Sequence, residues 1–372
     1  MAAMTTALGL MSGTSMDGID VAALRTDGET IVERGPSLFV PYDDTFRARI
    51  EAALQTAKVI EQRDQRPHDL AELERDLTQR HAEAVHAFRA KFPDWQPELI
   101  GFHGQTVLHR PAEGLTVQIG DGALLAQRTG TPVVYNMRAA DMVAGGQGAP
   151  LVPAYHVALA KSLPETFRRT PTVFVNIGGI SNVTYVPASG DPVAFDSGPG
   201  NQLIDQWMQR EGGLAFDADG VAAAKGSVHQ AIVEAYLQLP FFARPAPKSL
   251  DRGDFDLSGV QGLNLNDGAR TLAALAAEAV FAARKQMPET PKLWILCGGG
   301  RKNPHISGDL QRLAEADGGE VVAAEEVGLD GDATEAEAWA YLAVRSTRGL
   351  PLTWPTTTGC DRPVTGGVLA QP

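Results

Sequence analysis

Apolar and polar positions alternate along the first part of the chain in a way that predicts strands, a glycine-rich turn and two helices. Leu8–Met11 and Ile19–Leu24 are short apolar runs on either side of SGTSMDG, a pattern typical of a β-hairpin with glycine at its tip. A helix is expected over Thr45–Lys58. A longer one is expected over 68–92, because apolar residues recur there at helical spacing.

The middle of the chain continues this pattern less regularly. LIGFHGQTVLHR predicts a strand that ends at a glycine turn, and LTVQIGD and PVVYN predict two further short strands. NMRAADMVAGGQGAPLVP is too rich in glycine for a regular element, so it is either a linker or a binding loop. His81 and His86, on the long helix, are expected to face solvent.

The second half begins with TVFVNIGGISNVTYV, which again predicts a strand, a glycine turn and a strand. FDSGPGN then leads from a strand into a helix, and KLWILCGGG is a buried strand that runs into three glycines. NLNDGARTLAALAAEAVFAARKQ is a strongly amphipathic helix, with Asn266 or Asp267 expected as its N-cap. Strands alternating with helices favour an α/β fold, and the two similar hairpins suggest a duplicated domain.

Composition narrows the classes of partner. The 372 residues carry 32 basic and 45 acidic side chains, a net charge of -13, which argues against binding to nucleic acid or to an acidic membrane. The two cysteines, Cys297 and Cys360, form no spaced pair, so neither a disulfide framework nor a cysteine zinc cluster is expected. No signal peptide or transmembrane segment is evident, and a cytoplasmic location is expected.

Four strand ends punctuated by glycine carry the candidate chemistry: SGTSMDG, NIGGISN, FDSGPGN and CGGGRKNP. Glycine lets backbone N–H groups approach an anion closely, and open α/β sheets bind ligands at strand ends. The first loop lacks both the P-loop lysine and a GxGxxG pattern, so on local grounds it could also be a plain hairpin turn. Together the four segments favour a site for a nucleotide or a sugar.

The full set of motifs resembles a known family. SGTSMDGID, FHGQT, GGQGAPLVP, NIGGISN, FDSGPGN, CGGGRKNP and GLDGDATEAEAWAYLA occur in the order seen in anhydro-N-acetylmuramic acid kinases. The resemblance implies a duplicated, actin-like (ribonuclease-H-like) two-domain α/β fold with a central cleft. It implies a first domain of residues 1–137 plus about 355–372 and a second of residues 138–354, with closure about Tyr135–Met142.

The resemblance also implies ATP and Mg²⁺ as cofactors. The residues expected at ATP come from three loops: Gly13, Thr14, Ser15, Met16, Asp17, Gly18, Ile19 and Asp20; Gly178, Gly179 and Asn182; Gly298, Gly299 and Asn303. Asp17 is a candidate for the hydration shell of Mg²⁺, or else a turn residue that bonds to its own backbone.

Asp196 is the expected catalytic base, because it ends an apolar run just before SGPGN. By resemblance it takes a proton from the water that attacks the anomeric carbon of 1,6-anhydro-N-acetylmuramic acid. Glu335 either assists this water or the metal, or it only stabilises the first turn of its helix.

Six further residues are expected at the sugar: His103, Gln105, Arg138, Asp141, Gly200 and Asn201. Arg138 suits the lactyl carboxylate, since a guanidinium can hold it with two bonds, although Arg138 and Asp141 could instead form an interdomain salt bridge. His103 and Gln105 either face the sugar or brace the hairpin. Gly200 and Asn201 start a helix whose N–H groups could meet an anion.

The function implied is an ATP-dependent kinase that hydrolytically opens the anhydro sugar and phosphorylates it at the 6-position, in recycling of peptidoglycan sugar. A simple hexosamine kinase without hydrolysis and a nucleotide-binding, actin-like regulator without turnover are the alternatives. A small-molecule substrate is expected, without nucleic acid or membrane, and a homodimer is possible.

Overall fold

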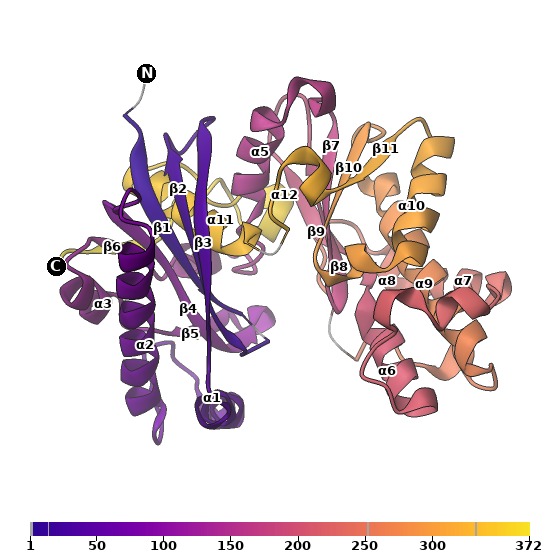
Figure 1. Cartoon of the computed structure of the whole chain (residues 1–372), viewed down its shortest axis with the longest axis horizontal. Coiled ribbons are helices and arrows are strands. Elements are labelled where there is room, and N and C mark those ends of the chain that lie inside the picture. Colours follow the sequence, from indigo (N-terminus) through magenta and orange to yellow (C-terminus); the bar gives the residue numbers. More distant parts are fainter. Residues whose placement is uncertain (1–2, 14, 251–252, 332) are drawn as a thin grey trace. The chain divides into compact units, whose positions relative to one another are not determined.

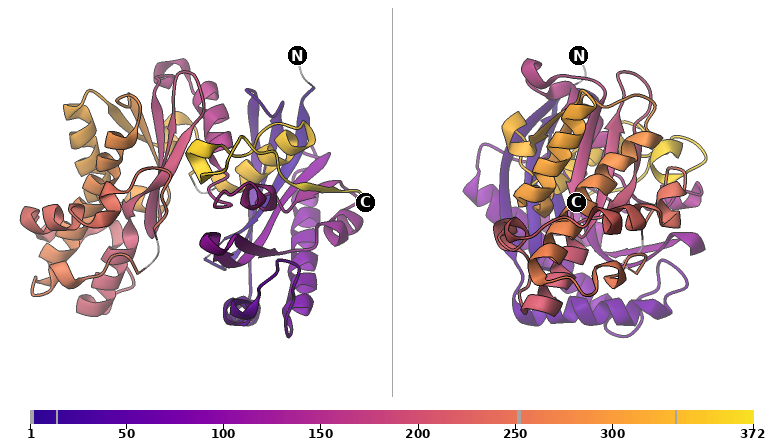
Figure 2. Two further views of the ribbon diagram at one scale, coloured as in Figure 1. Left: turned by 180° about the vertical axis from the view of Figure 1, so that it is seen from behind. Right: turned by 90° about the vertical axis from the view of Figure 1, so that its right-hand side faces the viewer.

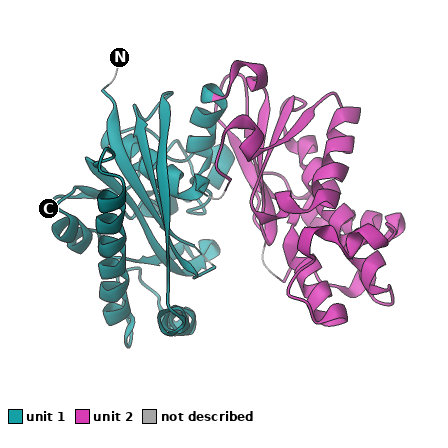
Figure 3. Cartoon of the chain, in the orientation of Figure 1, with its two compact units in different colours: residues 1–162, 333–372 teal, residues 163–332 magenta. Residues whose placement is uncertain are grey.

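The chain folds into two compact units, shown in Figure 3. The computed structural model describes residues 3–13, 15–250, 253–331 and 333–372. Unit 1 combines residues 1–162 with residues 333–372, and unit 2 is the continuous segment 163–332. Each unit has its own sheet and helices, so the predicted α/β class is confirmed.

The sheet of unit 1 has the strand order β12-β6-β4-β1-β2-β3, with β5 paired to β4. β1, β2 and β3 form an antiparallel meander, while β1 pairs with β4, and β4 with β6, in parallel. The strands are β1 (Thr5–Ser12), β2 (Gly18–Thr26), β3 (Val32–Pro41), β4 (Leu99–Arg110), β5 (Leu115–Ile119), β6 (Val133–Tyr135) and β12 (Val368–Ala370).

Helices cover both faces of this sheet, as Figures 1 and 2 show. Leu8 and Leu10 of β1 pack with α2 in one apolar cluster, because alternate residues of a strand point to the same face. Gly9 between them faces α11, where a Cβ atom would lie 1.8 Å from the carbonyl oxygen of Ala336. Gly101 of β4 meets the same helix at Trp339. Glycine therefore lets α11 lie directly on the sheet.

The helices of unit 1 come from both ends of the chain. They are α1 (Asp44–Thr56), α2 (Leu70–Lys91), α3 (Gly122–Thr129), α4 (Ala139–Val143), α5 (Pro153–Ser162), α11 (Thr334–Thr347) and α12 (Pro355–Thr358). Asp43 caps α1 by accepting a hydrogen bond from the N–H of Phe46. The helix begins at Asp44, one residue before the predicted start at Thr45.

The sheet of unit 2 has the strand order β11-β10-β7-β8-β9, which repeats the part β6-β4-β1-β2-β3 of the sheet of unit 1. β7, β8 and β9 form an antiparallel meander, and β7 pairs with β10, and β10 with β11, in parallel. The strands are β7 (Thr172–Ile177), β8 (Ile180–Val186), β9 (Val193–Pro199), β10 (Leu293–Cys297) and β11 (Glu320–Ala323). Two sheets of the same order and direction confirm the predicted duplication.

The helices of unit 2 are α6 (Asn201–Gly212), α7 (Gln230–Leu237), α8 (Pro240–Ala243), α9 (Leu265–Ala282) and α10 (Pro304–Ala316). α6 and α9 pack closely because Gly268 leaves room for the ring of Trp207, whose Nε1 donates to the carbonyl of Leu265. The N-cap of α9 is Asn264, whose side chain accepts from the N–H of Asp267. The predicted cap at Asn266 or Asp267 was wrong, because the helix begins at Leu265 and both residues lie inside its first turn.

The units divide at other points than the predicted domain boundaries of 137/138 and 354/355. α5 stays with unit 1, where the Tyr155 hydroxyl donates to Glu337, and α11 also belongs there because it packs on β1 and β4. The structure therefore divides the chain at 162/163 and 332/333.

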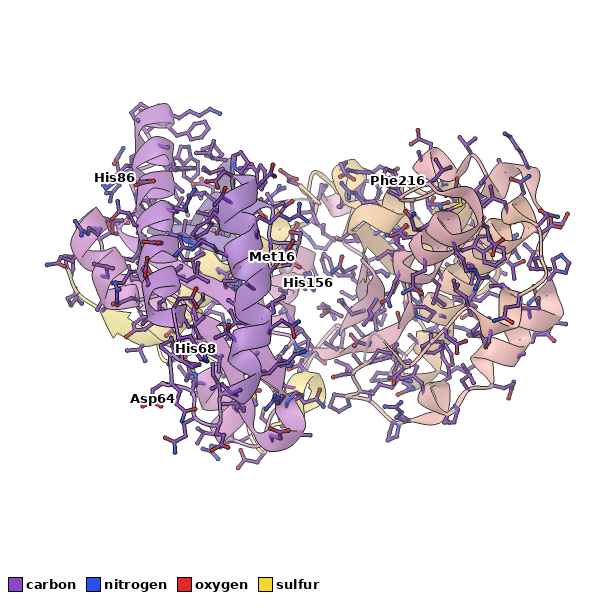
Figure 4. The ribbon with its side chains drawn as sticks, turned by 90° about the horizontal axis from the view of Figure 1, so that it is seen from below. Met16, Asp64, His68, His86, His156 and Phe216 are labelled. Carbon is purple, nitrogen blue, oxygen red and sulfur yellow. The ribbon has the colours of Figure 1, made fainter. Side chains whose placement is uncertain are left out.

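Two local predictions are corrected. His81 does not face solvent: it is fully buried, its Nδ1 lies 2.8 Å from the carbonyl oxygen of Leu77, and its ring packs edge-on against Phe102. His86 is exposed, as Figure 4 shows. β4 does not end at Gly104 but continues to Arg110, because its second half pairs with β5. None of the helices in the described ranges is long and apolar enough to cross a membrane.

Candidate active site

The first candidate segment is the loop between β1 and β2 in unit 1. Ser15 Oγ donates to Asp17 Oδ1 at 2.5 Å, and the N–H of Met16 donates to the carbonyl of Gly13 at 3.2 Å. Ser15 and Asp17 are exposed, whereas Gly18 and Ile19 are buried in β2. Thr14 lies outside the described residues. The loop therefore presents small polar groups at the surface, next to strands that fix its ends.

Side chains from neighbouring strands brace this loop. Ser12 Oγ donates to Gln105 Oε1 at 2.6 Å, and Gln105 Nε2 donates to the carbonyl of Gly13 at 3.2 Å. The hydroxyl of Tyr42 lies 3.0 Å from Ser12 Oγ. Gln105 is buried and its amide is used on both sides, so of its two expected roles the structure shows the bracing one.

In unit 2, three glycine-rich segments meet around the start of α6. The carbonyls of Gly178 and Gly179 accept from the N–H groups of Asn201 and Gly200, at 2.8 and 2.9 Å. These two amides, which were expected to meet an anion, are therefore bonded inside the protein. Their bonds hold the turn between β7 and β8 against the helix.

The loop after β10 joins the same cluster. Gly298 has φ +73°, and a Cβ atom there would lie 2.2 Å from Asn176 Oδ1, so only glycine fits this close approach. A Cβ atom on Gly300 would lie 3.0 Å from Asn201 Oδ1, whereas one on Gly299 would meet nothing nearer than 3.9 Å. The loop is thus packed at its ends and open in its middle.

Asn303, expected at ATP, is buried and caps α10. Its Oδ1 accepts from the N–H of His305 at 3.0 Å, and the ring of His305 lies 3.1 Å from the carbonyl oxygen of Gly220. Asn303 therefore fixes the direction in which the glycine loop enters the helix.

Asp196 lies in a row of polar side chains that crosses three strands. Asn176 of β7 pairs with Asn182 of β8, and Asn182 pairs with Asp196 of β9, so the three side chains share one face of the sheet. All three are half-buried. Asn176 was not among the predicted site residues, although it precedes the glycine turn on β7 and pairs with Asn182, which follows the turn on β8. This position in NIGGISN is the signal that could have identified it.

The segment 248–250 holds Asp196 in place. Asp196 Oδ2 accepts from the N–H of Leu250 at 2.8 Å, and the N–H of Asp196 donates to the carbonyl of Lys248 at 2.9 Å. Lys248 Nζ donates to the carbonyl of Phe241 at 3.0 Å and lies 4.4 Å from the ring centroid of Phe241. Burial lowers the pKa of Lys248 to about 8. The buried side chain of Lys248 thus anchors the backbone segment that is hydrogen-bonded to Asp196.

Arg138 and His103 form a second group, in unit 1. Arg138 Nε and Nη2 lie 3.2 and 3.0 Å from His103 Nε2, and Arg138 Nη1 donates to the carbonyl of Gly148 at 2.7 Å. The ring of Trp339 lies against both groups, 4.4 Å from the His103 ring and 5.2 Å from the guanidinium carbon. Burial and the charge of Arg138 hold the pKa of His103 well below its usual range, so this histidine is neutral.

Asp141, predicted to contact the sugar, is buried and bonds inside unit 1. Its Oδ2 accepts from the N–H of Gly148 at 2.7 Å. Its Oδ1 accepts from the hydroxyls of Thr353 and Thr358, at 2.5 and 2.6 Å. The carboxylate therefore ties the 146–148 loop to the segment after α11.

Glu335 lies in the first turn of α11 and is exposed. Loss of hydration among the surrounding protein atoms raises the pKa of its carboxyl, and the positive charge of Arg138 opposes that shift. A carboxylate at a helix N-terminus also interacts favourably with the helix dipole. Glu335 thus belongs electrostatically to the group formed by Arg138, His103 and Trp339.

The two groups can do different chemistry. Unit 2 holds a carboxylate of fixed orientation beside backbone that is open at glycine, an arrangement suited to accepting a proton from a small molecule. Unit 1 holds a hydroxyl-rich loop and a cation–aromatic group. In the described part of the chain, no group of three or more His, Cys, Asp or Glu side chains is arranged so that it could hold a metal ion.

Comparisons with known proteins match the chain along its whole length. The sequence model of the family described as anhydro-N-acetylmuramic acid kinase matches residues 5–372. The anhydro-N-acetylmuramic acid kinase of Agrobacterium fabrum is 58% identical over 368 residues, 98% of this chain and 98% of that protein. That of Rhizobium johnstonii is 55% identical over 369 residues, 99% of each. A solved structure of the activator of the 2-hydroxyisocaproyl-CoA dehydratase from Clostridium difficile aligns with a TM-score of 0.44 at 10% identity, covering 92% of this chain and 96% of that one.

Proposed function

The chain belongs to the anhydro-N-acetylmuramic acid kinase family and is a phosphotransferase, and we propose that it couples hydrolysis of the anhydro bridge to phosphoryl transfer. The substrate is 1,6-anhydro-N-acetylmuramic acid, and the product is N-acetylmuramic acid 6-phosphate. This activity serves the recycling of peptidoglycan sugar.

The position of Asp196 supports this proposal most directly. One of its carboxylate oxygens is fixed at 2.8 Å by the N–H of Leu250, and Asn176 and Asn182 line up beside it on the same face. A carboxylate held in this way is suited to act as a general base, which typically contributes about 10²- to 10⁴-fold to a rate. A protein that only binds a nucleotide has no need of such a base.

The reaction needs one base and one phosphoryl acceptor. Asp196 takes a proton from water while the water oxygen bonds to the anomeric carbon, and the bond from that carbon to the bridging oxygen breaks. The bridging oxygen, which stays on carbon 6, leaves as the acceptor of the γ-phosphoryl group of ATP. No separate acid is required for that oxygen, because the phosphoryl group neutralises it. The products are the 6-phosphate, ADP and the proton held by Asp196.

Glycine positions in both units fit a bound phosphate chain. Around Gly13, Gly179 and Gly299, a Cβ atom would meet nothing nearer than 3.6 Å, so the backbone is open to an approaching anion. We propose that these segments hold ATP, and that the exposed carboxylate of Asp17 faces a hydrated Mg²⁺. When bound, ATP supplies the phosphoryl group and Mg²⁺ offsets its negative charge.

The test follows the oxygen of water. The purified protein is incubated with ATP, Mg²⁺ and 1,6-anhydro-N-acetylmuramic acid in ¹⁸O-water, and the sugar product is analysed by mass spectrometry. We expect a 6-phosphate with one heavy oxygen, and its formation is expected to fall by about 10²- to 10⁴-fold in Asp196→Asn. Unlabelled product kept in ¹⁸O-water for the same time corrects for exchange at the anomeric position.

Asp191→Asn is the matched control, since Asp191 is exposed in the loop before β9 and should retain full activity. Phosphorylation of free hexosamines alone, without heavy oxygen, would replace the proposal with a simple hexosamine kinase. ATP binding without any sugar product would indicate the actin-like regulator.

A further inference from the structure

Unit 1 contains a cavity that is lined by His103, one of the residues expected at the sugar, and by several residues to which no role was assigned. Its volume is about 320 Å³, within the range of about 300–1,000 Å³ in which proteins hold small ligands. The segment before α2 forms one wall, with Arg63, Asp64 and Arg66. β4, the end of β5 and the end of β6 form the others, with His103, Gln118 and Asn136. Asp64 is labelled on that first segment in Figure 4.

Arg63 is a half-buried cation that pairs with no anion among the described residues. Its Nε is buried without a hydrogen-bond partner, and its guanidinium forms no ion pair within the described residues. Arg66 differs, because Glu74 holds it with two bonds of 2.8 and 2.9 Å. Burial and the charge of Arg66 lower the pKa of Arg63. Leaving a half-buried guanidinium unpaired is unfavourable, so the cavity is built to receive an acceptor.

Two other residues that line the cavity, Gln118 and Asn136, carry acceptors without donors. Gln118 Oε1 and Asn136 Oδ1 are both buried without a partner. Gln118 Nε2 is used, since it donates to the hydroxyls of Thr106 and Thr116 at 3.2 and 2.9 Å. Buried polar groups in proteins are nearly always paired, so two such atoms on residues that line one cavity favour a polar ligand there. A ligand with both an anionic group and N–H or O–H donors satisfies the two walls.

Each guanidinium nitrogen of Arg138 already has a contact within the protein. Its N–H groups are directed at the carbonyl of Gly148 and at His103 Nε2, and its face lies on Trp339. Arg63 has none of these contacts. Asp64 lines the same cavity, but its side chain is exposed to solvent.

We propose that this cavity binds the carboxylate-bearing arm of the amino sugar, and that Arg63 rather than Arg138 recognises the lactyl carboxylate. The inference rests on the proposed function, because it specifies which part of that substrate unit 1 recognises. Gln118 and Asn136 accept from the N–H and O–H groups of the same sugar. Arg63 is thereby the residue that distinguishes a muramic sugar from an otherwise identical sugar without the acid.

The test compares two substrates that differ only in the acid. Initial rates are measured with 1,6-anhydro-N-acetylmuramic acid and with 1,6-anhydro-N-acetylglucosamine, for wild type, Arg63→Met, Arg63→Lys and Arg75→Met. Arg75 is exposed on α2 and does not line the cavity, so its variant controls for the lost charge. Arg63→Met should raise KM for the acid-bearing sugar by about 10- to 100-fold, as expected for a lost bond between charged groups.

Further measurements distinguish the loss of carboxylate recognition by Arg63 from a general loss of folding or activity. KM for the neutral analogue should change by less than about 3-fold, and Arg63→Lys should fall between wild type and Arg63→Met. The melting temperature of Arg63→Met should equal or exceed that of wild type, because an unpaired cation is removed. An equal loss with both sugars, or an unchanged KM for the acid-bearing sugar, would overturn the proposal.

Failure of the proposed function gives a different result. If wild type phosphorylates neither sugar, titration calorimetry still measures binding of each one to the protein. Tighter binding of the acid-bearing sugar that Arg63→Met abolishes would support the cavity assignment on its own. Equal affinity of wild type for the two sugars would overturn it.

Discussion

The two sheets have the same strand order but place different chemistry at the end of the central hairpin. In unit 1, Met11, Asp20 and Phe39 lie opposite one another across β1, β2 and β3. In unit 2, the corresponding meander aligns three polar side chains, which end in Asp196. The turns differ as well: unit 2 has a tight turn held by α6, whereas unit 1 has a longer loop that Gln105 braces from β4.

This difference indicates that the two units share the arrangement of their strands but not the side chains at the hairpin turn. The order and direction of the strands repeat, because each sheet needs a meander and parallel strands with helices on its faces. The side chains at the turn are free to differ, since function depends on the site and not on the fold. Unit 2 accordingly carries the candidate base, and unit 1 carries the exposed hydroxyl loop and the cavity beside Arg63.

The largest expected effect tests whether unit 2 supplies the catalytic base while the loop of unit 1 binds the metal and the nucleotide. Asp196→Asn should lower kcat by about 10²- to 10⁴-fold with little change in the affinity for ATP, because a base acts on the reaction and not on nucleotide binding. Asp17→Asn should instead raise the concentration of Mg²⁺ and ATP required, with a smaller loss of kcat. Steady-state kinetics with both ligands varied separates the two. If both variants changed the same parameter to the same extent, the contrast between the units would be wrong.

The second effect concerns stability at the glycines. In Gly9→Ala, the new Cβ would lie 1.8 Å from the carbonyl oxygen of Ala336, so β1 and α11 must move apart. We expect a loss of about 3 kcal/mol, or about 6 to 12 °C in the melting temperature of a unit of this size. Gly299→Ala in unit 2 meets nothing nearer than 3.9 Å and should leave the melting temperature nearly unchanged. Calorimetry of the two variants compares them, and equal melting temperatures would contradict the tight packing of α11.

The third effect is a pH dependence that differs between the units. Burial lowers the pKa of His81 to about 4, that of His156 to about 3, and that of His103 well below its usual range, and all three belong to unit 1. In the unfolded chain these three histidines bind protons near pH 6.5, whereas in the folded unit they remain neutral at that pH. The stability of unit 1 should therefore be complete above that pH and fall below it, by at most about 1.4 kcal/mol per pH unit for each histidine.

Unit 2 should respond in the opposite direction. Burial raises the pKa of Asp205 to about 6, so the folded state binds this proton first and gains stability as the pH falls below 6. Hydrogen exchange between pH 6.5 and 5 reports on the two units separately. His86→Gln, at an exposed position, should not alter the slope of unit 1. Parallel slopes in the two units would show that the buried histidines do not control acid stability.

The smallest effect concerns helix caps, which should matter equally in both units. Asn264→Ala removes the acceptor for the N–H of Asp267 in α9, and Asp43→Ala removes the one for Phe46 in α1. Each should cost about 0.5 to 2 kcal/mol, measured by denaturant unfolding. A much larger loss for Asp43→Ala would show that its contact with Arg80, at 2.8 Å, adds to the cap.

Local pattern predicted the strands and hairpins well, because period-2 apolar runs and glycine turns are properties of a few adjacent residues. The same reasoning placed the cap of α9 two or three residues late, since Asn264, Asn266 and Asp267 are all suitable residue types. It misjudged His81, whose burial depends on the packing of α2 against Phe102 of a distant strand.

The candidate site was predictable where it lies on motifs and not where it depends on contacts between distant segments. Asp196 belongs to FDSGPGN, one of the motifs on which the resemblance to the family rests, and the structure places it within β9. The contact of Arg138 with His103 and Trp339, and that of Asp141 with Thr353 and Thr358, join residues far apart in sequence. The unpaired state of Arg63 is likewise visible only in three dimensions, because the sequence does not show that Glu74 bonds to Arg66 instead.

The division of the chain also sets an order for folding during synthesis. Unit 2 is a single continuous segment, whereas the sheet of unit 1 lacks α11 and β12 until residues 333–372 have been made. Until then, Gly9 and Gly101 lie on a sheet face without its covering helix. During synthesis, all residues of unit 2 are therefore joined before the last part of unit 1 is made, although unit 1 is begun first.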